Sequence, residues 1–331
     1  MGVPWHDEPD HRDWPLGDGR VLVHSPWATG QDAGRFFPFG NRGDLPPDQR
    51  AEDGRSVCLD LEIGDTPVDL LGNGTVRLRL RSTHDRGHVI VRLCDVAPDG
   101  SSTLVTRGVL NLLKRDGMDR VSPLKPGEDV DVEVPLISAG YRFTPGHRLR
   151  VALSNHYWPW VWPHAVDDTL DIDLSASSLR LPLVSDEAVP VGFEPPEHAR
   201  PLTITVPPGA TEPRPERLVR HDVARRETVL EVDPGYGGTR QYPDGLSFLE
   251  SAEEIYTIRE AEPSSPRADS HWQLRLTNDG WAADIETWST ITCDAEHFIV
   301  ENRLLAHAER DGLRELVADR VFRDVVPRTS A

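Results

Sequence analysis

The sequence predicts an all-β protein, in which a jelly-roll sandwich is followed by a second antiparallel β region. Short stretches of alternating apolar and polar residues recur along the chain, as in Val76 to Leu80 and Val130 to Val134. This period of two places the apolar side chains on one face of a strand. Turn-forming sequences separate the stretches, and the 331 residues include 29 Pro and 26 Gly, which favours turns over long helices. Strands at this spacing are typical of sandwiches and jelly rolls.

Residues 1–55 are predicted to lead into the sandwich without forming a core of their own. Met1 to Asp18 is charged and contains prolines, so we expect a linker there, and Arg20 to His24 is the first expected strand. Thr29 to Pro47 is irregular and carries Phe36, Phe37 and Phe39. These rings need cover, either at a junction with another domain or as a cap on the sandwich of this chain. The sequence leaves both interpretations open.

Residues 56–185 are predicted to form the sandwich. Pro98-Asp-Gly100 and Pro145-Gly146 are turn sequences of the kind that join neighbouring strands. After the second turn, Leu149, Val151 and Leu153 share one face of a predicted strand. The expected strands are 57–61, 68–71, 76–80, 89–95, 102–112, 130–134, 149–153, 169–174 and 179–184.

Four stretches of this region resemble a known family. They are "LPPDQRAEDGRS" at 45–56, "RLCDVAPDGSSTLVTRGVLNL" at 92–112, "RFTPGHRLRVALS" at 142–154 and "YWPWVWP" at 157–163. They are similar to the C-terminal β domain of X-Pro dipeptidyl-peptidases and of cocaine-esterase-like acyl esterases. In that serine-hydrolase family an α/β-hydrolase domain precedes a galactose-binding-like jelly roll. The resemblance extends past Pro190 to the C-terminal part of longer bacterial members.

The catalytic signature of that family is missing from this chain. A nucleophile elbow reads Gly-x-Ser-x-Gly, and the nearest match here, Gly54-Arg-Ser56-Val-Cys58, fails at its last position. In the family the Asp and His of the triad also precede the jelly roll. The resemblance therefore implies a non-catalytic domain, with no catalytic residue of its own. It would pack on an α/β-hydrolase domain, in the same chain or in a separate one, and shape the substrate cleft of that domain.

The rest of the chain is predicted to hold a linker and a second antiparallel set of strands. Residues 186–217 are proline-rich and include one short expected strand at Leu202 to Val206, and the antiparallel β region spans 218–331. Asn278-Asp-Gly280 and Arg310-Asp-Gly312 are hairpin signals. Between Trp281 and Trp288 strict alternation breaks, which suggests a bulge. Leu313 to Phe322 also fits an amphipathic helix, but we prefer a strand.

Composition excludes several functional classes. The net charge of -19 argues against binding to nucleic acid or to an anionic membrane surface, since both repel an acidic protein. No apolar run approaches the roughly 20 residues of a membrane span, and the polar N-terminus is no signal peptide. We therefore expect a cytoplasmic protein. Cys58, Cys94 and Cys293 have no metal or disulfide spacing, so we expect buried thiols.

The aromatic segment around residue 160 is the strongest candidate for a contact site. Clustered rings can form a carbohydrate platform or one wall of a pocket, and they can also fill a core or a domain interface. We expect the core or interface role, and a free-standing carbohydrate- or ligand-binding module is the alternative. The candidate interdomain or ligand surface consists of Phe36, Phe37, Phe39, Tyr157, Trp158, Trp160 and Trp162.

Three other groups of polar residues are interpreted as structural and not as functional sites. The histidines and aspartates His84, His88, His164, Asp167 and Asp168 lack a recognised metal spacing, so no metal or cofactor is predicted. Ser154, Asn155 and His156 are adjacent, but nothing nearby suggests an oxyanion hole. Asp48, Glu52 and Asp53 are expected to form salt bridges with Arg50 and Arg55. The predicted partner is an α/β-hydrolase domain or subunit, and a homo-oligomer is left open.

Overall fold

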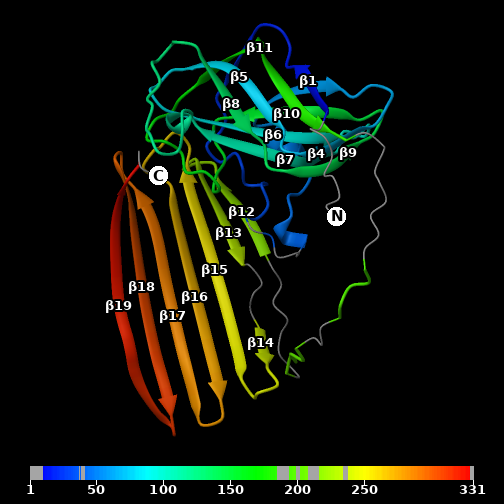
Figure 1. The fold of residues 1–331 in the computed structure, drawn as a ribbon. Helices are drawn as coiled ribbons and strands as arrows, with labels where there is room; N and C mark the ends of the chain where they lie inside the picture. Colours follow the sequence, from blue (N-terminus) through cyan, green and yellow to red (C-terminus); the bar gives the residue numbers. More distant parts are fainter. Residues whose placement is uncertain are drawn as a thin grey trace. The chain divides into compact units, whose positions relative to one another are not determined.

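The computed structural model describes residues 10–36, 38, 42–184, 194–198, 202–207, 216–233 and 238–328, and nearly all of its regular structure is β (Figure 1). The chain divides into two compact units, residues 1–190 and 191–331, which we call unit 1 and unit 2. Each is described by itself. In the described part of the chain, no helix is long and apolar enough to cross a membrane.

Unit 1 is a sandwich of two antiparallel sheets, which confirms the predicted fold class. The first sheet has the order β8-β5-β11-β4-β9, with β1 and β2 also paired to β11, and the second has the order β3-β10-β6-β7. The strands of the first sheet are β1 (Asp10–Pro15), β2 (Arg20–Val23), β4 (Val68–Gly72), β5 (Thr75–Ser82), β8 (Val130–Pro135), β9 (Ala139–Phe143) and β11 (Leu170–Leu183). Those of the second are β3 (Val57–Glu62), β6 (His88–Val96), β7 (Ser102–Asn111) and β10 (Arg148–Ser154).

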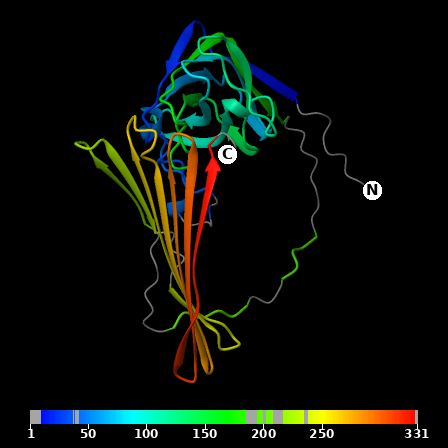
Figure 2. The same ribbon diagram turned by 90° about the vertical axis from the view of Figure 1, so that its left-hand side faces the viewer.

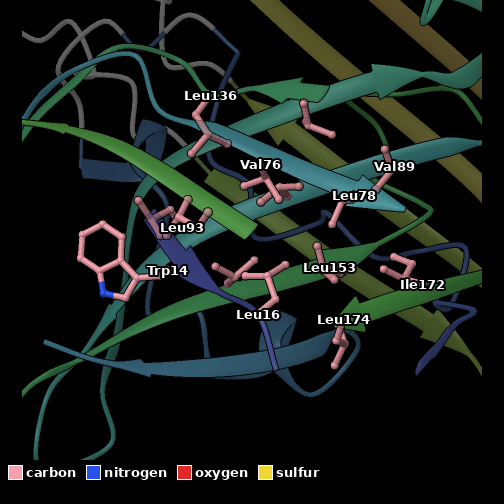
Figure 3. Packing of buried hydrophobic residues seen from close by; sticks show 14 of the residues in the cluster. Trp14, Leu16, Val76, Leu78, Val89, Leu93, Leu136, Leu153, Ile172 and Leu174 are labelled. Carbon is pink, nitrogen blue, oxygen red and sulfur yellow. The ribbon is translucent and has the colours of Figure 1, made fainter. Parts of the chain in front are cut away.

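The core lies between the two sheets, where the predicted alternation places it. Leu78 of β5, Val89 of β6, Leu153 of β10 and Ile172 of β11 are fully or almost fully buried there (Figure 3). Strand β6 is buried along its whole length. Ile90 on its other face packs with Ala33 of the loop before residue 36 and with Tyr157 of the aromatic segment. The short helix α1 (Arg50–Asp53) adjoins the same strand through the ion pair between Asp53 and Arg92. This outer layer carries the candidate site.

The structure corrects two expectations for unit 1. Residues 10–15 are not linker, because β1 pairs with β11 from Asp10 opposite Leu183 to Pro15 opposite Ser178, and Trp14 is buried. The two strands expected at 169–174 and 179–184 are one strand, β11, whose pairing with β5 shifts register between Asp173 and Ser178. A local irregularity therefore looks like a strand boundary in the sequence.

Unit 2 contains one eight-stranded antiparallel sheet with the order β12-β13-β15-β16-β17-β18-β19, and β14 pairs with β15 (Figure 2). Its strands are β12 (Glu216–Asp222), β13 (Glu227–Asp233), β14 (Gly238–Gln241), β15 (Ser247–Arg259), β16 (Arg267–Asn278), β17 (Trp281–Cys293), β18 (His297–Arg310) and β19 (Leu313–Pro327). Both hairpin predictions are confirmed, since β16 pairs with β17 and β18 with β19 across the two Asp-Gly turns.

Three finer expectations for unit 2 can be judged. Leu313 to Phe322 is strand and not helix, as preferred. The bulge expected between Trp281 and Trp288 is absent there, and the register shift lies between Ala306 and His307, where β18 faces β19. The strand expected at Leu202 to Val206 is wrong, because this segment forms only a single bridge, from Thr205 to Gln241. The segment therefore meets β14 at one residue only and does not form a ladder with it.

Candidate interdomain surface

The first two rings of the aromatic segment are anchors in the outer layer of unit 1. Tyr157 is fully buried and Trp158 is 1% exposed. The backbone N–H of Trp158 donates to the carbonyl oxygen of Thr29 at 2.6 Å. Gly30 has φ +105°, and a Cβ there would lie 2.6 Å from the carbonyl carbon of Tyr157, so only glycine fits this close approach. These two rings therefore fasten the aromatic segment to the loop before residue 36.

The later rings of the segment reach the surface. Trp160 is half-buried, and its indole N–H donates to the carbonyl oxygen of Gly34 at 3.2 Å. The guanidinium of Arg107 lies 3.8 Å from the ring centroid of Trp160 and donates to the carbonyl oxygen of Ala33 at 2.7 Å. Phe36, 80% exposed, meets Trp160 edge-on at 5.1 Å. Because Arg107 covers one face of Trp160, only the other face and the edge of the ring are left for contact with a further molecule.

Phe36 and Trp160, whose rings are in contact, form what we call the aromatic patch. Trp162 is half-buried and contacts Trp158 edge-on, with ring centroids 5.2 Å apart. Phe37 and Phe39 are also predicted from the sequence to belong to this surface, and they lie outside the described residues. Sequence reasoning missed Arg107. Its only local signal is that it is the single charged residue of β7.

The acidic cluster of the lead-in segment organises the same layer. Glu52 is fully buried, and its carboxylate accepts hydrogen bonds from the backbone N–H groups of Gly30 at 2.8 Å and Asp32 at 3.1 Å. Arg55 donates to the same carboxylate at 3.0 Å. The expected local salt bridges are therefore present for Glu52 with Arg55 and for Asp48 with Arg50, but not for Asp53, which pairs with other arginines. In addition, Glu52 holds the loop against which the aromatic anchors pack.

Asp53 fastens the helix α1 to the second sheet. Its carboxylate lies 2.9 Å from the fully buried guanidinium of Arg92 in β6 and 2.9 Å from that of Arg150 in β10. Asp60 accepts from Arg150 at 2.6 Å, and these contacts raise the pKa of the Arg150 guanidinium. Two strands and the lead-in helix thus meet at one buried carboxylate, which gives the 45–56 segment a structural role.

A second buried carboxylate ties together two of the sequence stretches that carry the family resemblance. Asp95, 5% exposed, accepts from the Tyr141 hydroxyl at 2.8 Å and hydrogen-bonds the Nδ1 atom of His147 at 2.9 Å. Burial together with this hydrogen bond raises the pKa of Tyr141 to about 12. Asp95 is the last residue but one of β6, Tyr141 lies within β9, and His147 directly precedes β10. These contacts fix the turn between β9 and β10 and have no nucleophile among them.

Ser154, Asn155 and His156 do not form a catalytic arrangement. The Ser154 hydroxyl and both ring nitrogens of His156 are buried and make no hydrogen bond. The His156 ring stacks on Trp27 at 4.9 Å, and burial lowers its pKa to about 3, so it is neutral at pH 7. Asn155 accepts from the backbone N–H of Ser25 and donates to the carbonyl oxygen of Asp168. The three side chains serve packing and loop closure.

The residues considered for a metal site are also dispersed. His88 and His164 stack on each other at 4.1 Å, and Asp167 accepts from the indole of Trp27 at 3.0 Å. Burial raises the pKa of Asp168 to about 7. Within the described residues, no three or more His, Cys, Asp or Glu side chains gather as metal ligands would.

Comparison with known proteins places this architecture among hydrolase accessory domains. A family model described as the X-Pro dipeptidyl-peptidase C-terminal non-catalytic domain matches residues 15–200. A putative serine esterase of Mycobacterium tuberculosis is 28% identical over 164 residues, which are 44% of this chain and 26% of the relative. The cocaine esterase of Rhodococcus is 28% identical over 141 residues, 42% of this chain and 25% of the relative. The chain thus spans about a quarter of the length of these relatives.

Solved structures show a similar but more distant likeness. An aminopeptidase from a marine sediment thaumarchaeon shares 16% identity with a TM-score of 0.45, over 53% of this chain and 37% of the other. An α-amino acid ester hydrolase shares 19% identity with a TM-score of 0.39, over 55% of this chain and 33% of the other.

Proposed function

Because the chain belongs to the family of X-Pro dipeptidyl-peptidase C-terminal non-catalytic domains, we propose that it is the accessory β part of a serine hydrolase. The parent activity is that of a dipeptidyl-peptidase or an acyl esterase. The serine nucleophile lies in an α/β-hydrolase domain, on which this domain packs and whose substrate cleft it helps to shape. The family match over residues 15–200 carries the proposal. It agrees with the lack of a Gly-x-Ser-x-Gly elbow in this sequence.

The aromatic patch supports the choice of surface. Phe36 is 80% exposed, and its ring contacts that of Trp160, against which the Arg107 guanidinium packs. Aromatic side chains held rigidly by their neighbours are the usual anchors of protein interfaces. We therefore assign Phe36 and Trp160 to the contact with the hydrolase domain.

The domain boundaries and location form part of the same proposal. Residues 56–185 are the jelly-roll domain, of the galactose-binding-like kind, and residues 1–55 lead into it. Residues 186–217 are a proline-rich link to an added β region at 218–331. The protein works in the cytoplasm.

The test is co-purification of the chain from its native lysate, followed by mass spectrometry. An α/β-hydrolase polypeptide recovered in equal amount supports the proposal. The Phe36→Ala, Trp160→Ala double variant should lose most of it, since interface anchors each contribute about 2 kcal/mol or more. Met118→Ala removes another exposed side chain, 82% accessible, and is the matched control. Recovery of the hydrolase unchanged by the double variant would show that the aromatic patch is not the contact.

A further inference from the structure

The sheet of unit 2 has two chemically different faces. Directly opposite residues on antiparallel strands share a face, so the pairing defines rows across the sheet. One row runs Ala252, Trp272, Thr287, Leu304 and Arg320, from β15 to β19. We call the face that carries this row the apolar face, and it also holds Leu274, Ile285, Ile291 and Phe322.

The opposite face, which we call the polar face, carries cross-strand ion pairs, and it also exposes Leu249, Val321 and Val325. His271 pairs with Glu286 at 2.7 Å, Arg275 with Asp284 at 2.9 Å, Arg303 with Asp319 at 3.1 Å and Arg323 with Glu301 at 3.2 Å. Such ladders are typical of a solvent-facing sheet surface. An amphipathic sheet must bury its apolar face against a second layer. From residue 216 on, the described residues of unit 2 are the strands of this one sheet and the turns between them, so these described residues supply no such layer.

We propose that the apolar face of unit 2 is a homodimer interface, in which the sheets of two copies pack face to face around a two-fold axis parallel to β17. Strands lie about 4.8 Å apart and rise about 3.4 Å per residue, so β15 to β19 present roughly 1,000 Å² on one face. A stable dimer needs about 800 Å² per partner. The available area is therefore sufficient.

The few charges on the apolar face select this orientation. Near its centre they are Glu250 and Glu254 of β15, and Arg320 and Asp324 of β19. The axis places β15 of one copy opposite β19 of the other, and it places each row opposite the same row of the other copy. Arg320 of one copy therefore faces Ala252 of the other. There it lies between Glu250 and Glu254, one row to either side, and Asp324 faces Tyr256. A two-fold axis perpendicular to the strands, through the same centre, would instead place the Arg320 side chains of the two copies opposite each other. It would also place Glu250 of one copy opposite Glu254 of the other, and like-charge repulsion disfavours both arrangements.

The first test is the mass of the full chain in solution, by size-exclusion chromatography with light scattering at about 1 to 100 µM. We expect a dimer, and Arg320→Glu should weaken it by roughly a hundredfold, because the new carboxylate would face two others. Adding Glu250→Arg and Glu254→Arg should restore it. The matched control is Arg323→Glu on the polar face of the same strand, which should leave the dimer intact.

A second test does not depend on charge reversal. Thr287 lies on the proposed axis, and sheets packed face to face lie about 10 Å apart, which is too far for a direct disulfide but within reach of a short bismaleimide. Thr287→Cys should therefore be cross-linked between two copies by that reagent, while Glu286→Cys on the polar face should not. A wild-type chain that is monomeric at about 100 µM would overturn the proposal, as would a dimer that Arg320→Glu leaves unchanged and Thr287→Cys does not cross-link. In either case a partner other than a second copy would cover the apolar face.

Discussion

The ion pair between Asp53 and Arg92 gives the sharpest stability prediction. Removing one partner of a buried pair leaves an uncompensated charge and costs about 3–5 kcal/mol. Arg92 is fully buried, and the Asp53 side chain is 6% exposed, so Asp53→Ala meets this condition. For a unit of this size each kcal/mol lowers Tm by about 2–4 °C, so unit 1 should lose about 6 to 20 °C.

The assay is differential scanning calorimetry of the full chain, following the transition of unit 1. Asp69→Ala is the matched control, since it breaks a pair of similar length with Arg142, which is 59% exposed. An exposed pair contributes about 0–1 kcal/mol, so the expected loss is at most about 4 °C. Adding Arg92→Met to Asp53→Ala should recover much of the loss by removing the stranded charge. Equal losses for Asp53→Ala and Asp69→Ala would refute the claim that this pair anchors the lead-in segment.

Two further predictions concern pH and backbone. Burial raises the pKa of Asp168 to about 7, whereas the same carboxyl in the unfolded state loses its proton near pH 4. Between about pH 4 and 7 the folded state therefore holds one more proton than the unfolded state, so this group lowers the free energy of unfolding as pH rises through that range. Burial lowers the pKa of His156 from 6.5 to about 3, which makes stability rise with pH over nearly the same range, so the two slopes oppose each other. Urea midpoints between pH 4 and 7 should therefore rise with pH in Asp168→Asn and fall with pH in His156→Phe; parallel curves for the two variants would contradict both assignments. Gly30→Ala should lower Tm more than Gly19→Ala, since both glycines have positive φ but only Gly30 has backbone atoms within 3 Å of the added Cβ. Equal losses of Tm would show that the loop moves away from the Cβ without loss of stability.

Local sequence patterns predicted the strands well where each strand has its own alternation and turn. Val76 to Leu80 and Leu149 to Leu153 are of this kind, and both are core strands of the sandwich. Strand β1 escaped prediction because Asp10 to Pro15 is polar apart from Trp14. It forms because β11, fourteen residues long, offers it an edge, which is a long-range effect that no window of sequence contains.

The candidate site was predicted in part, for a similar reason. The aromatic segment was recognised, but its division into buried anchors and a surface patch depends on Gly30 and Arg107, which lie far away in the sequence. The burial of Glu52 likewise depends on backbone N–H groups of a loop some twenty residues earlier. A charged residue that is buried by partners distant in sequence carries no local signal of its burial.

The central claim is that the nucleophile of the enzyme lies outside this chain. Its most direct test is treatment of the chain, together with any co-purified hydrolase, with a fluorophosphonate that labels activated serines, followed by intact-mass spectrometry of each polypeptide. We predict an adduct on the α/β-hydrolase polypeptide and an unchanged mass for this chain. An adduct on a serine of this chain that forms on the native protein but not on the denatured protein would contradict this claim.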